Sequence, residues 1–157
     1  MARISREQMF MDIAEVVAKR SACLRNNVGA VIVNEDNNIV AIGYNGPAAG
    51  VPQCTREECH AGCDIAIHAE DNAIRRMPEY SEYYDFLDNI HTTHSYRLFC
   101  TVSPCIACAK KIVERGDIID VYYRYPYRDS AGINYLLSHN IRVYKILTGG
   151  IINEEPM

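Results

Sequence analysis

Features that mark a membrane, secreted or nucleic-acid-binding protein are missing from these 157 residues. No apolar run approaches the roughly 18 residues that a membrane-spanning helix needs. The opening segment, residues 1–10, is too charged to be a secretory signal. The formal net charge is −4, whereas a large nucleic-acid surface is usually basic. We therefore expect a soluble, cytoplasmic protein that binds neither membranes nor nucleic acids, although a small phosphorylated ligand would need only a few local cations.

The sequence also has no internal repeat, no low-complexity tract and no linker rich in Gly, Ser or Pro. Its length suits a single domain over residues 1–157 with one sizeable core. The seven cysteines are an odd number. In a chain without a secretory signal, they indicate metal ligands or buried thiols rather than a disulfide framework.

Hydrophobic spacing and turn residues predict four helices and five strands. Helices are expected over residues 5–20, 68–77, 104–115 and 129–139. The first begins at a capping box formed by Ser5 and Gln8, and Pro104 is expected as the first residue of the third. Strands are expected over residues 29–33, 39–44, 96–101, 120–124 and 141–146. Residues 45–65 are expected to form a loop, and the tail over 148–157 to be loose.

The order of these elements predicts an α/β fold. The first two strands follow each other directly, which indicates an antiparallel hairpin. Strands that are separated by helices indicate parallel neighbours with right-handed crossovers. The expected architecture is therefore a mixed five-stranded sheet with an antiparallel opening hairpin and helices on both faces, in three α-β-α layers.

Two short motifs place chemically active side chains at the starts of two predicted helices. In "IHAED", His68 and Glu70 are two residues apart, so they would not face each other within a helix, but in the first turn both can reach past its end. In "PCIAC", Cys105 and Cys108 are three residues apart and share one face of the first turn. The start of a helix favours the thiolate form of cysteine. Both helix starts are expected at the carboxyl edge of the sheet, where ligands bind.

One histidine and two cysteines supply three zinc ligands, and three protein ligands with an open fourth position are typical of a catalytic zinc site. Glu70 is not needed as a ligand, so it can take a proton from a water on the metal and pass it on. H-x-E followed by P-C-x-x-C is the known signature of zinc deaminases. A structural zinc knuckle or a redox pair would leave Glu70 unexplained.

With both motifs in this context, the chain resembles the deoxycytidylate (dCMP) deaminases of the cytidine deaminase-like superfamily, and it looks like a phage or bacterial member. The resemblance covers about residues 23–146. It is carried by "CLRNNVGAVIV", "GYNGPAAG", "CTREECHAGC", "IHAEDNAI", "TVSPCIACAKKI" and "YYRYPYRDSAG". It implies the three-layer cytidine deaminase-like fold and zinc-dependent deamination of dCMP to dUMP for thymidylate supply, in the host cytoplasm if a phage encodes the chain. The alternative is the same chemistry on dCTP, or on both nucleotides, and another cytosine or adenine compound fits less well.

The resemblance also implies roles for individual residues. Glu70 would be catalytic, and the zinc ligands would be His68, Cys105 and Cys108. The backbone around Ala69 and Ser103 would contact the pyrimidine, and Asn45 would hold the sugar. The phosphate would be held by Arg25, Tyr127 and Arg128, since a guanidinium fork suits a phosphate. A triphosphate would need further cations, for which Arg56 and Arg124 are available.

The resemblance leaves further features open. One cluster would form either a second, structural zinc site, as in some family members, or a set of free thiols; it consists of Cys54, Cys59, His60 and Cys63. After "GYNGP", Ala48 and Ala49 stand where many members have Pro and Arg, in a segment that contributes to binding the effectors dCTP and dTTP. The missing cation weakens the expectation of such regulation, in which Mg2+ would accompany the nucleotide. Family members are commonly hexamers, so a homo-oligomer is expected, with the insertion over 79–94 as a subunit contact or a lid.

Overall fold

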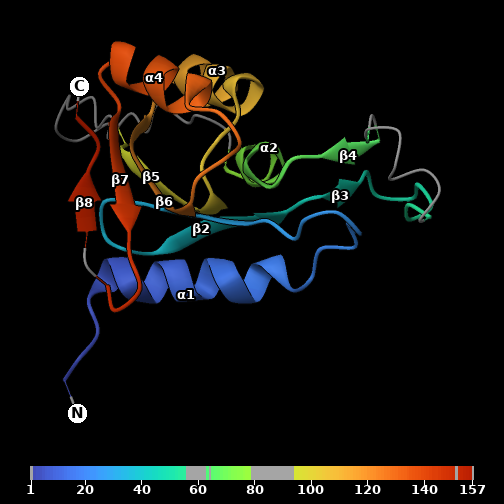
Figure 1. Ribbon diagram of the computed structural model, residues 1–157, viewed down its shortest axis with the longest axis horizontal. Helices are drawn as coiled ribbons and strands as arrows, with labels where there is room; N and C mark the ends of the chain where they lie inside the picture. The colour runs from blue at the N-terminus through green and yellow to red at the C-terminus, as the bar shows by residue number, and fades with distance from the viewer. Residues whose placement is uncertain (1, 56–62, 64, 79–93, 151, 157) are drawn as a thin grey trace, which may run out of the picture.

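A computed structural model describes residues 2–55, 63, 65–78, 94–150 and 152–156. Four helices and eight strands lie in these ranges (Figure 1), in the order α1 (Arg6–Ala18), β1 (Gly29–Val33), β2 (Ile39–Tyr44), β3 (Gly46–Pro47), β4 (Ala66–Ile67), α2 (Ala69–Arg75), β5 (Tyr96–Val102), α3 (Ile106–Arg115), β6 (Ile118–Tyr125), α4 (Ala131–Ser138), β7 (Arg142–Ile146) and β8 (Ile152–Glu154). The predicted cap of the first helix is confirmed, because Ser5 Oγ accepts a hydrogen bond from the backbone N of Gln8 at 3.0 Å. Within these ranges, no helix is long and apolar enough to cross a membrane.

The main sheet is mixed, and its strand order is β2-β1-β5-β6-β7-β8. β1 and β2 form the predicted antiparallel hairpin, and β5, β6 and β7 are parallel neighbours. The prediction that strands separated by a helix are parallel neighbours is wrong for β2 and β5, because β5 pairs antiparallel with β1 instead of lying beside β2. β1 therefore begins at the edge of the sheet where β2, β5 and β6 end. The segments that precede β1 and follow β2, β5 and β6 meet at this edge.

The prediction of five strands and a loose tail is wrong for the tail. Residues Ile152–Glu154 form a sixth strand, β8, which pairs antiparallel with β7. Glu155 continues the pairing by donating its backbone N–H to the Val143 carbonyl at 2.8 Å. Its carboxylate accepts a hydrogen bond from the Tyr123 hydroxyl. A second correction concerns the loop predicted over residues 45–65. Its start forms β3, which pairs antiparallel with β4, directly after the predicted loop, as a small two-stranded sheet.

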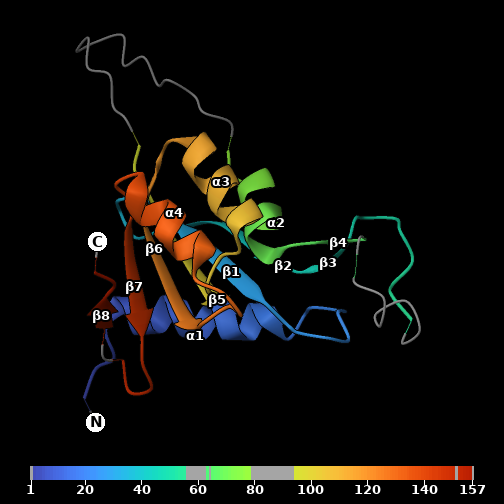
Figure 2. The same ribbon diagram turned by 45° about the horizontal axis from the view of Figure 1, so that its top comes forward.

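The helices cover both faces of the sheet, as predicted. α1 lies along one face, and α2, α3 and α4 lie on the other (Figure 1). On the α1 side, Phe10 packs against Phe99, whose ring stacks on Tyr122 with centroids 4.5 Å apart. On the other side, the core includes Leu98 and Val121 of the sheet, and α2 and α3 lie side by side (Figure 2). The two helices whose starts carry the predicted metal ligands are thus fixed on one face.

Candidate active site

Two of the predicted ligands occupy the residue that immediately precedes a helix. His68 is the N-cap of α2 and Cys105 is the N-cap of α3, and both have extended backbone conformations. An N-cap side chain commonly accepts a hydrogen bond from the first turn of its own helix. Neither of these side chains does so. Because Cys105 is the N-cap, Pro104 lies before α3. The prediction that Pro104 is the first residue of this helix is therefore wrong.

The third ligand lies in the first turn of α3, and it completes a compact group. His68 Nδ1 is 3.4 Å from Cys105 Sγ and 3.3 Å from Cys108 Sγ. The three ligand atoms all lie within 4.8 Å of one another. Around a tetrahedral zinc, a nitrogen and a sulfur ligand would be separated by roughly 3.5 Å, given the usual bond lengths. The spacing and the nitrogen–sulfur donor set therefore fit zinc.

The protonation of these groups also favours a cation. The hydrogen bond between the two thiols lowers the pKa of Cys105 to about 3 and raises the pKa of Cys108. The hydrogen bond to Cys105 raises the pKa of the His68 imidazole. Negative charge is thus stabilised on the Cys105 sulfur, which lies close to the other two ligand atoms. A divalent cation bound there would convert both thiols to thiolates.

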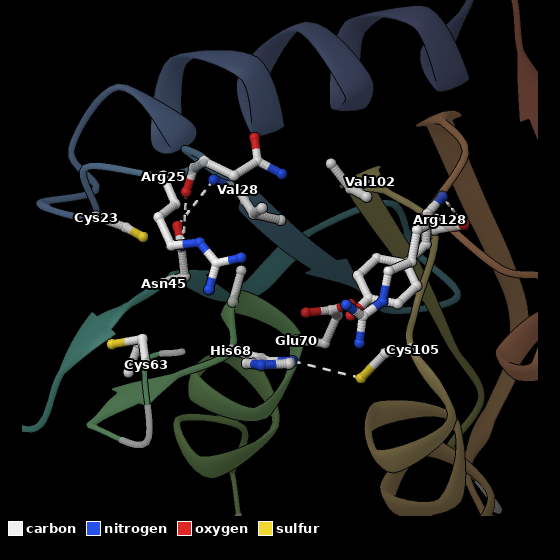
Figure 3. A pocket seen from close by; sticks show the side chains of 15 residues that line it. Cys23, Arg25, Val28, Asn45, Cys63, His68, Glu70, Val102, Cys105 and Arg128 are labelled. Carbon is white, nitrogen blue, oxygen red and sulfur yellow. Dashed lines mark hydrogen bonds between the residues drawn. The ribbon is translucent and has the colours of Figure 1, made fainter. Parts of the chain in front are cut away.

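Glu70 lies in the first turn of α2 and is buried, with 4% of its surface exposed. Burial raises the pKa of its carboxyl group to about 7, because the charged form loses hydration. A carboxyl group with such a pKa exchanges a proton readily at neutral pH. Figure 3 shows the Glu70 carboxylate beside Cys105, directed into the cavity.

Two glycines allow other elements to approach the backbone of the ligand-bearing turns. A Cβ atom on Gly132 of α4 would lie 1.9 Å from the Pro104 carbonyl oxygen, directly before Cys105. A Cβ atom on Gly43 of β2 would lie 2.2 Å from the Ala69 carbonyl oxygen, directly after His68. Since a real Cβ never approaches an oxygen so closely, glycine is required at both positions for this packing.

A cavity of about 630 Å³ opens above the candidate metal ligands. Its lining includes nine of the ten residues predicted for catalysis, zinc and substrate, namely Arg25, Asn45, His68, Ala69, Glu70, Ser103, Cys105, Tyr127 and Arg128. The tenth, Cys108, does not line the cavity and is buried. Topology explains this gathering, because the lining segments come from the edge of the sheet where β1 begins and β2, β5 and β6 end.

The two predicted phosphate-binding arginines extend toward the cavity from opposite sides, with Glu70 between them (Figure 3). Arg128 follows β6, and its guanidinium lies over the Tyr127 ring, 5.4 Å from the centroid. Arg25 comes from the loop between α1 and β1. Arg25, Arg128 and His68 are exposed, whereas Glu70 and Cys105 are buried, so the two cations lie at the solvent side of the carboxyl group.

The family model described as the cytidine and deoxycytidylate deaminase zinc-binding region matches residues 4–124. The chain belongs to this family. ComE operon protein 2 of Bacillus subtilis is 40% identical over 131 residues, which are 82% of this chain and 64% of the Bacillus protein. The deoxycytidylate deaminase of Mycobacterium phage D29 is 33% identical over 130 residues, covering 74% of this chain and 92% of the phage protein.

The fold agrees with this family assignment. The crystal structure of the dCMP deaminase from cyanophage S-TIM5 in complex with dCMP and dUMP matches with a TM-score of 0.76 and 34% identity. The match covers 92% of this chain and 99% of the cyanophage chain. The predicted resemblance and the cytidine deaminase-like fold are thus confirmed. The chain nevertheless spans only 64% of the length of the Bacillus relative.

Within this deaminase-family chain, two predicted substrate contacts also have hydrogen bonds that the sequence did not indicate. The side chain of Asn45 accepts from Ser21 Oγ and from the backbone N of Val28, at 2.6 and 2.8 Å, and donates to the Asn26 carbonyl at 2.7 Å. Ser103 Oγ accepts from the backbone N of Tyr127 at 2.7 Å. Both side chains therefore hold cavity loops in place, and one N–H of the Asn45 amide remains for a ligand.

The second predicted cluster is only partly described. The Sγ atoms of Cys54 and Cys63 lie 3.6 Å apart, and Cys63 lines the cavity. Cys59 and His60 lie outside the described residues, as does most of the insertion over 79–94. Within the described part of the chain, only one group of three or more potential metal ligands was found, formed by His68, Cys105 and Cys108.

The structure also changes the set of cations that is available for a larger ligand. Arg124 points to the α1 face, where it pairs with Asp12 and Glu15 at 3.3 Å each. It does not line the cavity, so the expectation that it could serve a triphosphate is wrong. Arg56 lies outside the described residues. The cavity also has lining residues that sequence reasoning missed, namely Cys23, Asn26, Val28, Ala66 and Val102, and Cys63 lines it although it was predicted only for the second cluster.

Proposed function

We propose that this chain catalyses the zinc-dependent hydrolytic deamination of dCMP to dUMP. The observation that carries the proposal is the position of Glu70, which is buried beside His68, Cys105 and Cys108 in a cavity that two exposed arginines also line. The family assignment and the likeness to a deaminase solved with dCMP and dUMP support the same reaction.

His68, Cys105 and Cys108 would hold the zinc ion, which when bound supplies a water molecule activated for attack. Glu70 takes a proton from the attacking water as its oxygen adds to C4 of the cytosine ring. Glu70 delivers that proton to N3 of the ring. It then carries the second proton of the water to the amino group, which leaves C4 as ammonia. A carboxyl group whose pKa is about 7 can both accept and donate a proton at neutral pH.

The remaining cavity residues would orient the nucleotide. The backbone at Ala69 and Ser103 would contact the edge of the pyrimidine ring, and the remaining N–H of Asn45 would donate to the sugar. Arg25, Tyr127 and Arg128 would bind the phosphate. Because Arg124 is paired with acidic residues of α1, the described cations suit a monophosphate better than a triphosphate.

The reaction is tested by measuring ammonia release from dCMP, dCTP, deoxycytidine and cytidine with zinc-loaded protein. We expect the highest kcat/KM for dCMP. Its single phosphate can pair with the arginines while its base reaches Glu70, whereas the nucleosides lack the phosphate and dCTP has more negative charge than the described cations can neutralise. Preference for dCTP would transfer the proposal to the triphosphate, and turnover of none of the four would contradict it. Since dUMP is the precursor of thymidylate, we place the reaction in deoxynucleotide supply.

Three finer features belong to this proposal. Cys54 and Cys63, with Cys59 and His60, would hold a second, structural zinc; a zinc content of two per chain that falls to one in Cys63→Ala would support this. We also propose a homo-oligomer, which light scattering on the eluted protein would measure. Effector binding by dCTP or dTTP, with Mg2+, would appear as a change in dCMP turnover, and Ala48 and Ala49 predict a small change.

A further inference from the structure

The loop between α1 and β1 brings Arg25 to the cavity without any regular secondary structure. Among the residues that the structure describes, the Arg25 guanidinium has no hydrogen-bond or ion-pair partner. Its position above the cavity therefore depends on the backbone of residues 21–28. What holds this backbone determines where the cation stands.

Two side chains hold the loop. Asn45, which follows β2, binds the carboxyl end of the loop through the backbone N of Val28 and the carbonyl of Asn26. Ser21 binds the amino end, because its Oγ accepts from the backbone N of Cys23 at 3.1 Å. The Ser21 hydroxyl also faces Asn45, with Oδ1 at 2.6 Å and the carbonyl oxygen at 2.8 Å. Ser21 thus connects one end of the loop to the residue that holds the other end, and Arg25 lies between the two attachments.

We infer that Ser21 is a positioning residue for phosphate recognition, acting through the loop that carries Arg25. The inference rests on the proposed function, since it assumes that Arg25 binds the phosphate of dCMP. Without the hydroxyl, the N–H of Cys23 loses its acceptor and Asn45 loses one donor. The loop then has one attachment instead of two, so the guanidinium samples more positions and binds the phosphate less well.

The effect should be confined to the phosphate end of the cavity. Glu70 and the metal ligands lie on α2, on α3 and at the starts of these helices, and their contacts do not involve Ser21. The chemical step should therefore proceed at the same rate once a substrate is bound. Asn45 keeps its bonds to the Val28 N–H and the Asn26 carbonyl in the variant, so its remaining N–H still faces the sugar. A ligand without a phosphate should therefore not sense the change.

The test compares Ser21→Ala with wild type on dCMP and on deoxycytidine. We expect KM for dCMP to rise about tenfold, which corresponds to roughly one lost hydrogen bond, while kcat stays unchanged and kcat/KM for deoxycytidine stays the same. Calorimetry can measure equilibrium binding of dUMP and deoxyuridine without turnover. In Ser21→Ala, the affinity for dUMP should fall while the affinity for deoxyuridine stays the same. Ser138→Ala is the matched control, because Ser138 Oγ donates to the Tyr135 carbonyl on α4 and does not line the cavity.

Each outcome has a separate meaning. Wild-type turnover of dCMP with an unchanged KM in Ser21→Ala would overturn the role of Ser21 and leave the proposed function intact. An equal loss for dCMP and deoxycytidine, or a fall in kcat, would show a general structural role and would also overturn it. If wild type did not discriminate dCMP from deoxycytidine, phosphate recognition at Arg25 would fail and the inference would fail with it.

Discussion

His68 and Cys105 are 37 residues apart in the chain, yet His68 Nδ1 lies 3.4 Å from Cys105 Sγ. Each residue is the N-cap of a helix, and the two helices pack side by side on one face of the sheet. Because neither side chain caps its own helix, both are directed at a shared point. The geometry of the metal site is therefore set by where two helices begin.

This geometry predicts that zinc binding depends on the side chains of the two N-cap residues. Cys105→Ser should lower the zinc content by about one ion per chain, because the hydroxyl is a much poorer zinc ligand than a thiolate. Metal content by mass spectrometry measures the loss, together with the thermal unfolding midpoint. Cys100→Ala is the control, since Cys100 is also buried but donates a hydrogen bond to the Tyr122 carbonyl instead of facing His68. Equal zinc content in Cys105→Ser and wild type would contradict the assignment.

Gly132 should be needed for the position of Cys105. Gly132→Ala would place a Cβ atom 1.9 Å from the Pro104 carbonyl oxygen. We expect the free energy of unfolding to fall by about 1–3 kcal/mol, as for other overpacked sites, and zinc to be lost faster to a chelator. In the control Gly46→Ala, the added Cβ meets nothing within 4 Å. Urea unfolding and chelator kinetics measure both effects, and equal behaviour of the two variants would be the contrary result.

Asp71 links α2 to α3 one turn beyond the metal ligands. Its carboxylate accepts from Lys111 Nζ at 2.5 Å and from Arg75 Nε at 3.0 Å. Burial acts to raise the pKa of Asp71, but the hydrogen bonds from Arg75 and Lys111 outweigh it and lower the pKa below 3.8. Since the folded pKa lies below the unfolded one, this carboxylate stabilises the fold fully above about pH 4 and loses its contribution on acidification.

Two comparisons test this link. The difference in unfolding free energy between wild type and Asp71→Asn should shrink as the pH is lowered from about 6 to about 3, measured by urea unfolding. Lys111→Met should release zinc to a chelator faster than Arg75→Met, because only Lys111 joins the two helices. If the difference in unfolding free energy stayed constant with pH, the ionised Asp71 carboxylate would not be the source of the stabilisation. If Lys111→Met and Arg75→Met released zinc equally fast, Lys111 would not link the two helices in a way that matters for the metal.

The candidate site was predictable because its signals are local. The spacing of His68 and Glu70, and that of Cys105 and Cys108, requires only that helices begin there, and the structure places all four together. The helices and the opening hairpin also followed from periodicity and turn residues. Such patterns report short-range geometry, which a sequence carries directly.

Features that depend on distant partners were missed. β8 forms in a tail with little periodicity because β7 offers an open edge for pairing. Arg124 is available for a triphosphate by sequence alone, but alternation along β6 turns it toward acidic residues on α1. The hydrogen bonds between Ser21 and Asn45 join positions 24 residues apart. None of these pairings leaves a periodic signal in a single sequence.

The central claim is that Glu70 moves protons beside a metal held by other residues. The most direct test is dCMP turnover by Glu70→Gln, with zinc content measured on the same sample. Glutamine keeps the size of the side chain but cannot accept the proton, so kcat should fall by roughly 10²–10⁴-fold. Zinc should stay at the wild-type content, because Glu70 is not a ligand. Loss of zinc together with activity would make Glu70 part of the metal site, and unchanged kcat would contradict the proposed mechanism.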